Sequence, residues 1–190
     1  MKSLFWSLFC AVSLTFSPAA LAQTSPQDSR LSKIHSKIVT DHPALTHVSG
    51  AEITALINND QNILLLDVRE AKEFSVSHID GAVRVDPDIS LKDFMARFGD
   101  KAIGKQVILY CSVGRRSSRL GDNVREALLT AGATRVSNLE GGVFRWHNAH
   151  GPLVSGDIET DKVHPYNIWW GRLLERKGAI AYTPDARQDR

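Results

Sequence analysis

Short apolar runs alternate with amphipathic segments through the middle of the chain. Residues 63–66 and 107–110 are consecutive apolar positions, a pattern typical of strands that are buried on both faces of a parallel sheet. Residues 82–85 form another candidate strand, and residues 135–139 form a weaker one. The pattern therefore predicts several short strands in a buried sheet.

Helical periodicity separates these strands. It predicts helices at about 49–58, 90–99 and 117–132, a further helix after Gly141-Gly142, and a short helix around residues 31–38. Ser49 and Glu52 have the spacing of a capping box, and Gly99 and Gly132 are expected to end their helices. The alternation of strands and helices predicts an α/β fold with a mainly parallel central sheet and helices on both faces.

The first residues have the layout of a secretory signal peptide. Lys2 precedes an apolar stretch over residues 4–16. Ala20-Leu21-Ala22 then provides small residues at the two positions that a signal peptidase recognises. We expect cleavage before Gln23 and export to the periplasm; an uncleaved N-terminal anchor is the alternative. The predicted organisation is a signal peptide at 1–22, an N-terminal extension at 23–45, a central domain at 46–155 and a C-terminal extension at 156–190.

Composition excludes several classes of function. The 190 residues carry a net charge of +2, too small to predict nucleic-acid binding. The histidines lack the spacing of metal ligands beside cysteine or carboxylate clusters, so we expect no metal and no other cofactor.

In the C-terminal extension, Trp169 and Trp170 pair at helical spacing with Leu173 and Leu174. This predicts a short helix that packs on the domain, or alternatively one that binds a protein partner or a membrane interface.

Cysteine usage narrows the chemistry. The chain has two cysteines, and Cys10 lies in the predicted signal peptide, so the mature protein retains Cys111 without a partner for a disulfide. An unpaired thiol in an oxidising compartment is exposed to oxidation unless it is buried or used. A buried, inert cysteine and a reactive cysteine are both open at this point.

The segment around Cys111 favours reactivity. Residues 111–117 connect a predicted strand to a predicted helix, which places them at the carboxyl edge of the sheet, where ligands bind in open α/β sheets. Gly114 permits a tight turn, and the amides of such a loop together with the start of the helix favour an anion. Arg115, Arg116 and Arg119 add positive charge, and all of these features favour a thiolate at Cys111.

Three motifs in the same order resemble the rhodanese family. Cys111 begins a loop similar to the pattern C-x-x-G-x-R; residues 67–70, 73–74 and 78–82 are similar to D-V-R-E, E-F and H-I-x-G-A; residues 139–142 with Trp146 and residues 151–153 are similar to the segment that closes that domain. Ser77 departs from the glycine usual there. The resemblance spans about 110 residues and implies a rhodanese-like three-layer fold over residues 46–155.

The resemblance also implies a sulfurtransferase that carries sulfur as a persulfide on Cys111. An anionic inorganic donor such as thiosulfate would supply the sulfur, and cyanide or a thiol would accept it. The residues expected to bind the donor are Ser112, Val113, Gly114, Arg115, Arg116 and Ser117, with Arg69 as a further candidate that could instead form a structural ion pair.

Three other functions compete with this one. A cysteine phosphatase needs five residues between its cysteine and its arginine, and that position holds Ser117 here, which disfavours a phosphatase. A non-catalytic binding module would not need Cys111. A redox sensor would oxidise Cys111, but the mature chain has no second cysteine to form a disulfide within one chain.

Overall fold

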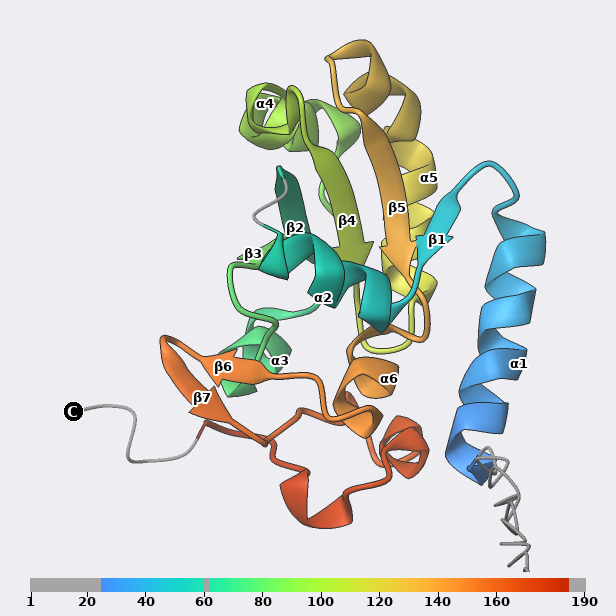
Figure 1. Ribbon diagram of the computed structural model, residues 1–190, viewed down its shortest axis with the longest axis vertical. Helices are drawn as coiled ribbons and strands as arrows, with labels where there is room; N and C mark the ends of the chain where they lie inside the picture. Colours follow the sequence, from blue (N-terminus) through green and yellow to red (C-terminus); the bar gives the residue numbers. More distant parts are fainter. Residues whose placement is uncertain (1–24, 60–61, 185–190) are drawn as a thin grey trace, which may run out of the picture.

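Five parallel strands form the central sheet of the computed structural model, which describes residues 25–59 and 62–184 (Figure 1). The predicted signal peptide at 1–22 lies outside the described residues. The strands stand in the order β1-β5-β4-β2-β3, and every neighbouring pair is parallel. Their bounds are Thr46–Val48 (β1), Ile63–Asp67 (β2), Val83–Arg84 (β3), Gln106–Tyr110 (β4) and Arg135–Leu139 (β5).

Helices cover both faces of this sheet, which confirms the predicted three-layer α/β fold. They are α1 (Pro26–Asp41), α2 (Gly50–Asn58), α3 (Ala71–Val76), α4 (Leu91–Ala102), α5 (Arg115–Thr130) and α6 (Gly142–Asn148). Side chains alternate along β2, so that Leu64 and Leu66 belong to the core under α4 and α5, whereas Leu65 belongs to the core under α2 and α6. A strand that is buried on both faces therefore has a continuous run of apolar residues in the sequence.

Three helices have other bounds than the sequence predicted. Helix α1 spans Pro26–Asp41 and is longer than the short helix predicted around residues 31–38. Helix α4 continues past Gly99 to Ala102, and Gly104, with φ at 71°, supplies the left-handed residue after it. Gly99 is buried inside the helix, and a Cβ there would lie 3.3 Å from the Met95 methyl carbon. Helix α5 begins at Arg115 rather than Ser117, because Gly114 precedes it in a left-handed conformation with φ at 96°. The first turn of α5 therefore includes Arg115 and Arg116.

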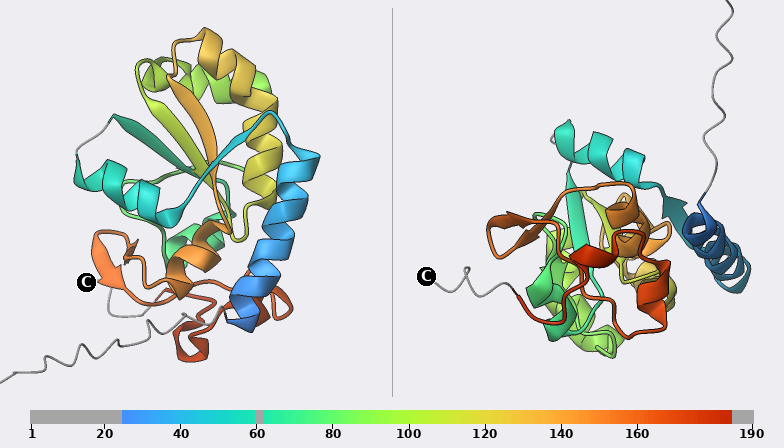
Figure 2. Two further views of the ribbon diagram at one scale, coloured as in Figure 1. Left: turned by 45° about the vertical axis from the view of Figure 1, so that its right-hand side comes forward. Right: turned by 90° about the horizontal axis from the view of Figure 1, so that it is seen from below.

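The C-terminal segment folds back across the carboxyl ends of the strands (Figure 2). It contains the antiparallel strands β6 (Leu153–Ser155) and β7 (Ile158–Thr160), followed by two 3₁₀ helices, η1 (Trp170–Leu173) and η2 (Lys177–Ala179). The predicted helix at Trp169–Trp170 is thus a single 3₁₀ turn. Leu173 and Leu174 are buried in the core, which confirms that this helix packs on the domain. Within the described ranges, no helix is long and apolar enough to cross a bilayer.

A contact between two histidines joins helix α1 to β1 and predicts acid sensitivity. The rings of His35 on α1 and His47 on β1 lie edge to face with centroids 4.8 Å apart, close to Glu140 and Arg145. Burial, and then the charge of His35, lowers the pKa of His47 from 6.5 to about 4, and burial lowers that of His35 as well. At neutral pH both rings are therefore neutral in the folded protein.

We expect the free energy of unfolding to fall as the pH drops from 6.5 towards 4, because in that window the unfolded chain binds a proton at His47 that the folded chain does not. For this partly buried ring the loss is about 1–2 kcal/mol. Urea unfolding of wild-type protein and His47→Gln across this range measures it. The variant should show a shallower pH dependence; equal slopes would contradict the prediction.

Candidate active site around Cys111

Cys111 lies in a tight loop between β4 and α5, at the carboxyl edge of the sheet. Gly114 ends the loop, and a Cβ there would lie 3.1 Å from the Asn138 side-chain amide and 3.4 Å from Ile38. Its positive φ and this close packing explain why a glycine occupies the position. At Gly114 the loop is therefore packed closely between β5 and α1.

The loop carbonyls face away from the pocket. The Val143 N–H donates to the Cys111 carbonyl at 2.9 Å, and the Phe144 N–H donates to the Ser112 carbonyl at 3.0 Å. The start of α6 therefore fixes the carbonyls of the loop. The backbone N–H groups from Ser112 through Ser117 have no acceptor in the part of the chain that the structure describes. Such a run of free amides before a helix is suited to bind an anion.

A buried carboxylate that the sequence analysis did not single out holds Arg116. Glu73 of α3 accepts two hydrogen bonds from the Arg116 guanidinium, at 2.7 and 2.8 Å, and a third from the Ser112 hydroxyl at 2.8 Å. Burial alone would raise the pKa of Glu73, but the hydrogen bonds and charge of Arg116 outweigh it, so the pKa is lowered. Glu73 therefore remains ionised and compensates the charge of Arg116.

Arg115 has the opposite environment. Its side chain is exposed and lines the pocket of Cys111, and within residues 25–59 and 62–184 it forms no ion pair. Arg119 is also exposed but pairs with Asp88 at 3.2 Å and does not line this pocket. Arg115 therefore contributes the uncompensated positive charge of the pocket, together with the start of α5.

The expectation that Arg69 binds a donor is wrong, and its alternative as an ion-pair residue is confirmed. The Arg69 side chain is fully buried, and its guanidinium donates to the Asp67 carboxylate at 2.8 and 2.6 Å and to the Ser77 carbonyl at 2.6 Å. Burial alone would lower the pKa of Arg69, but Asp67 outweighs it and raises the pKa. Arg69 thus braces the segment before α3 and does not reach the pocket.

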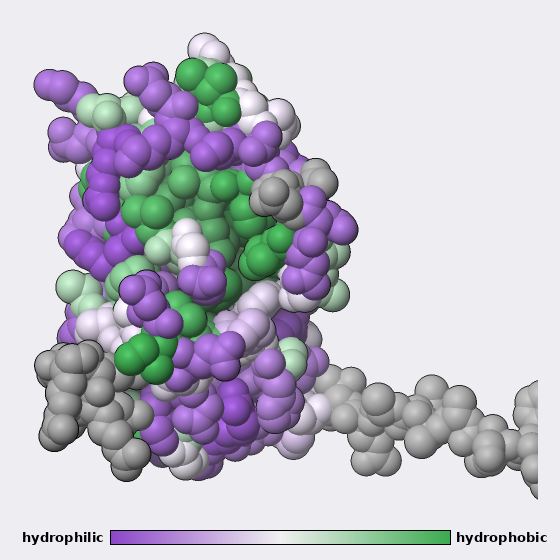
Figure 3. Space-filling model, turned by 60° about the vertical axis from the view of Figure 1, so that its left-hand side comes forward, coloured by the Kyte–Doolittle hydropathy of each residue, from purple (hydrophilic) through white to green (hydrophobic). Residues whose placement is uncertain are grey.

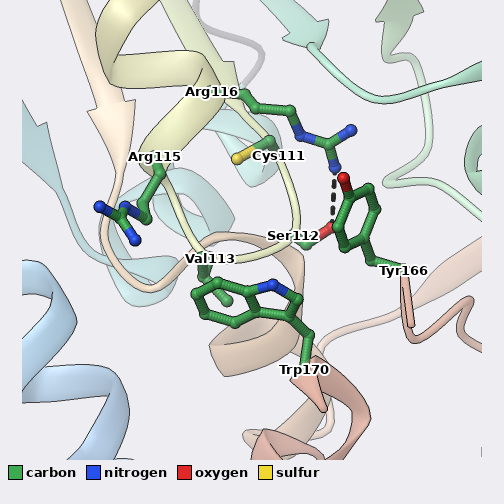
Figure 4. Close-up of a pocket in the computed structure, with 7 residues that line it drawn as sticks. All are labelled: Cys111, Ser112, Val113, Arg115, Arg116, Tyr166 and Trp170. Atoms are coloured by element: carbon green, nitrogen blue, oxygen red, sulfur yellow. Dashed lines mark hydrogen bonds between the residues drawn. The ribbon is translucent and has the colours of Figure 1, made fainter. Parts of the chain in front are cut away.

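Five of the predicted site residues meet at one cavity of about 190 Å³. It is lined by Cys111, Ser112, Val113, Arg115 and Arg116 together with Tyr166 and Trp170 (Figure 4). Gly114 and Ser117 do not line it, and the Ser117 hydroxyl instead donates to Asn138 at 2.6 Å. Only 1% of Cys111 is exposed, so this cavity is the approach to its sulfur.

Tyr166 and Trp170 come from the C-terminal extension. In Figure 4 their rings lie across the pocket from the loop, and the Arg115 and Arg116 side chains extend on either side of Cys111. The sequence analysis identified the helical spacing of Trp170 and Leu174 but could not place the ring beside Cys111. Trp169 is 67% exposed and does not line this pocket, so its role in binding a protein partner stays a prediction.

A second hollow lies elsewhere on the surface. Figure 3 shows a hydrophobic depression on the side of the molecule that carries α2. A cavity lined by Ile57 of α2, Trp146 of α6 and Val154 of β6, among other residues, shares no lining residue with the pocket of Cys111. None of the predicted site residues lies in it.

Comparison with known proteins decides the family. The sequence model of the rhodanese-like domain family matches residues 49–149, which is more than half of the chain. The chain belongs to the rhodanese-like domain family. Its Cys111 loop, its Asp67–Glu70 segment and its Gly141-Gly142 turn all lie within the matched residues.

Relatives of this rhodanese-like chain differ in length and in description. It is 30% identical over 112 residues to a tRNA uridine(34) hydroxylase of Oceanobacillus iheyensis, a match that covers 57% of this chain and 32% of the hydroxylase. It is 37% identical over 82 residues to the Bacillus subtilis protein YqhL, covering 43% of this chain and 59% of YqhL. The chain thus spans about a third of the hydroxylase and rather more than half of YqhL.

Solved structures agree with the rhodanese-like fold. Thiosulfate sulfurtransferase from Pseudomonas aeruginosa superposes with a TM-score of 0.51 at 23% identity, over 67% of this chain and 23% of that chain. The BH2092 protein from Bacillus halodurans superposes with a TM-score of 0.51 at 19% identity, over 78% of this chain and 99% of that chain. At these identities the likeness is one of fold.

Proposed function

We propose that this rhodanese-like protein is a sulfurtransferase that moves sulfane sulfur from an anionic, thiosulfate-like donor to a thiophilic acceptor through a persulfide on Cys111. The observation that carries the proposal is the loop itself. The sulfur of Cys111 lies in a cavity beside amides that have no acceptor in the described chain, at the start of a helix and next to Arg115. These groups bind negative charge.

The chemistry takes place in two displacements. The Cys111 thiolate attacks the outer sulfur of the donor; the new S–S bond forms as the donor's own S–S bond breaks, and sulfite leaves with the electron pair when the donor is thiosulfate. Cyanide then attacks the outer sulfur of the persulfide, which releases thiocyanate and restores the thiolate. The free loop amides and Arg115 would hold the oxygens of the donor and then the anionic persulfide.

The named relatives support the domain more than a particular reaction. The match to the tRNA uridine(34) hydroxylases covers about a third of their length. It therefore supports a shared domain in this chain and does not support the hydroxylation reaction named for those longer proteins. We also propose that residues 1–22 direct export, with the periplasm as the destination. Export is tested by the N-terminal sequence of the protein recovered from periplasmic extracts.

Intact-mass spectrometry after incubation with thiosulfate tests sulfur transfer. We expect the protein to gain the mass of one sulfur atom on Cys111, and to lose it again when cyanide is added, with thiocyanate released. A stable gain of oxygen at Cys111 with no sulfur adduct would favour the redox sensor instead. An unchanged mass with every sulfur donor tested would contradict the proposal and leave a binding module.

A further inference from the structure

The C-terminal extension builds an aromatic wall opposite the Cys111 loop. We define the aromatic wall as Tyr166 and Trp170, which line the same cavity as Cys111. The wall is firmly anchored, because Leu173 and Leu174 are buried in the core and the Asn148 side chain donates to the Leu173 carbonyl at 2.9 Å. The segment that carries the rings is therefore packed on the domain beside the pocket.

Tyr166 has a strained backbone conformation. Its φ is 64°, in the left-handed region, where a residue with a bulky side chain costs on the order of 1–3 kcal/mol. Its N–H donates to the His164 ring at 3.0 Å, and the Asn167 N–H bonds the Pro165 carbonyl at 2.7 Å. The turn places the Tyr166 ring 4.8 Å from the Arg116 guanidinium. Strain that puts one ring at the reactive pocket points to a function in that pocket.

The charges around the wall suit a single negative charge better than two. Glu73 compensates Arg116, which leaves Arg115 as the uncompensated cation among the described residues that line the pocket. The faces of the tyrosine and tryptophan rings carry partial negative charge. They therefore attract the C–H groups of a hydrocarbon and repel a compact dianion. Val113 adds a further apolar surface.

The pocket therefore combines an anion-binding loop with a surface for hydrocarbon. Its volume of about 190 Å³ lies below the roughly 300–1,000 Å³ of drug-sized sites, so it suits a small organic ion. Burying a hydrocarbon group against the rings would add binding free energy that inorganic thiosulfate cannot obtain.

We propose that Tyr166 and Trp170 determine donor specificity and select a small organic thiosulfonate, R–SO₂–S⁻, over thiosulfate. This rests on the sulfur transfer proposed above. The Cys111 thiolate attacks the terminal sulfur of the thiosulfonate, the Sγ–S bond forms, the donor's S–S bond breaks, and the sulfinate R–SO₂⁻ leaves with the electron pair. The R group packs on the aromatic wall, and Arg115 and the loop amides hold the sulfonyl oxygens.

Steady-state kinetics with benzenethiosulfonate and with thiosulfate, each with cyanide as acceptor, test the proposal. We expect kcat/KM of the full-length protein to be higher for benzenethiosulfonate. Trp170→Ala should lower the ratio of the two kcat/KM values roughly tenfold, mainly through the organic donor. Trp169→Ala is the matched control, because its ring is exposed and does not line the pocket; it should leave the ratio unchanged.

Tyr166→Gly is a second variant in case Trp170→Ala disturbs the core. It removes the other ring and suits the positive φ, so the fold should be kept while the ratio falls. An equal ratio in wild-type protein, Tyr166→Gly and Trp170→Ala, with thiosulfate still active, would overturn the specificity proposal and leave sulfur transfer standing. No thiocyanate from either donor would overturn sulfur transfer itself.

Discussion

Replacing Cys111 with serine is expected to reduce thiocyanate formation by about a thousandfold or more. A serine hydroxyl is almost fully protonated at neutral pH and cannot form a persulfide, so the pathway loses its intermediate. The remaining loop would still bind the donor, since its free amides and Arg115 are unchanged. Donor binding without turnover is therefore the expected behaviour of this variant.

The measurement combines the rate of thiocyanate formation with donor binding by calorimetry. Cys111→Ala serves as a companion variant, because both substitutions remove the thiol while they differ in polarity and volume. Thermal unfolding of both variants controls for loss of the fold, since Cys111 is buried beside β4. If either variant kept wild-type turnover, Cys111 would not carry the sulfur.

Replacing Gly142 with alanine is expected to disrupt the Cys111 loop and to destabilise the protein by ~3 kcal/mol or more. A Cβ at Gly142 would lie 2.3 Å from the Cys111 carbonyl oxygen and 2.7 Å from the Ser112 carbonyl oxygen. Both neighbours are backbone atoms that hydrogen-bond the start of α6, so they cannot move without breaking those bonds. The loop amides would then lose their arrangement around Cys111.

Gly156→Ala is the matched control for this substitution. Gly156 has the same φ, 57°, but nothing lies within 4 Å of its added Cβ. The control therefore reports the backbone strain alone, on the order of 1 kcal/mol, and should keep full sulfur-transfer activity. Urea unfolding and the thiocyanate assay on both variants separate strain from the clash. Equal losses in the two variants would show that the contact with the loop carbonyls does not matter.

The sequence by itself determined four of the five strands of the sheet, most of its helices and the position of Cys111, whereas β1 and α3 were not predicted. These features depend on local rules: apolar runs form strands that are buried on both faces, helical spacing gives one apolar face, and Gly114 permits the left-handed residue before α5. Because each rule acts over a few residues, the strand, the loop and the helix around Cys111 could be predicted in order. The predictions failed at helix ends, where Gly99 continues a helix that a glycine often stops.

Only the tertiary structure decided which charges act in the pocket and what forms its far wall. Glu73 lies 43 residues from Arg116 in the chain, so its compensation of that cation follows from the packing of α3 against the loop. Arg69 is buried by the same packing, and Arg115 is left uncompensated. Tyr166 and Trp170 reach Cys111 because Leu173 and Leu174 bury their side chains in the core. Such contacts form between segments that are distant in the chain, so a local sequence pattern does not predict them.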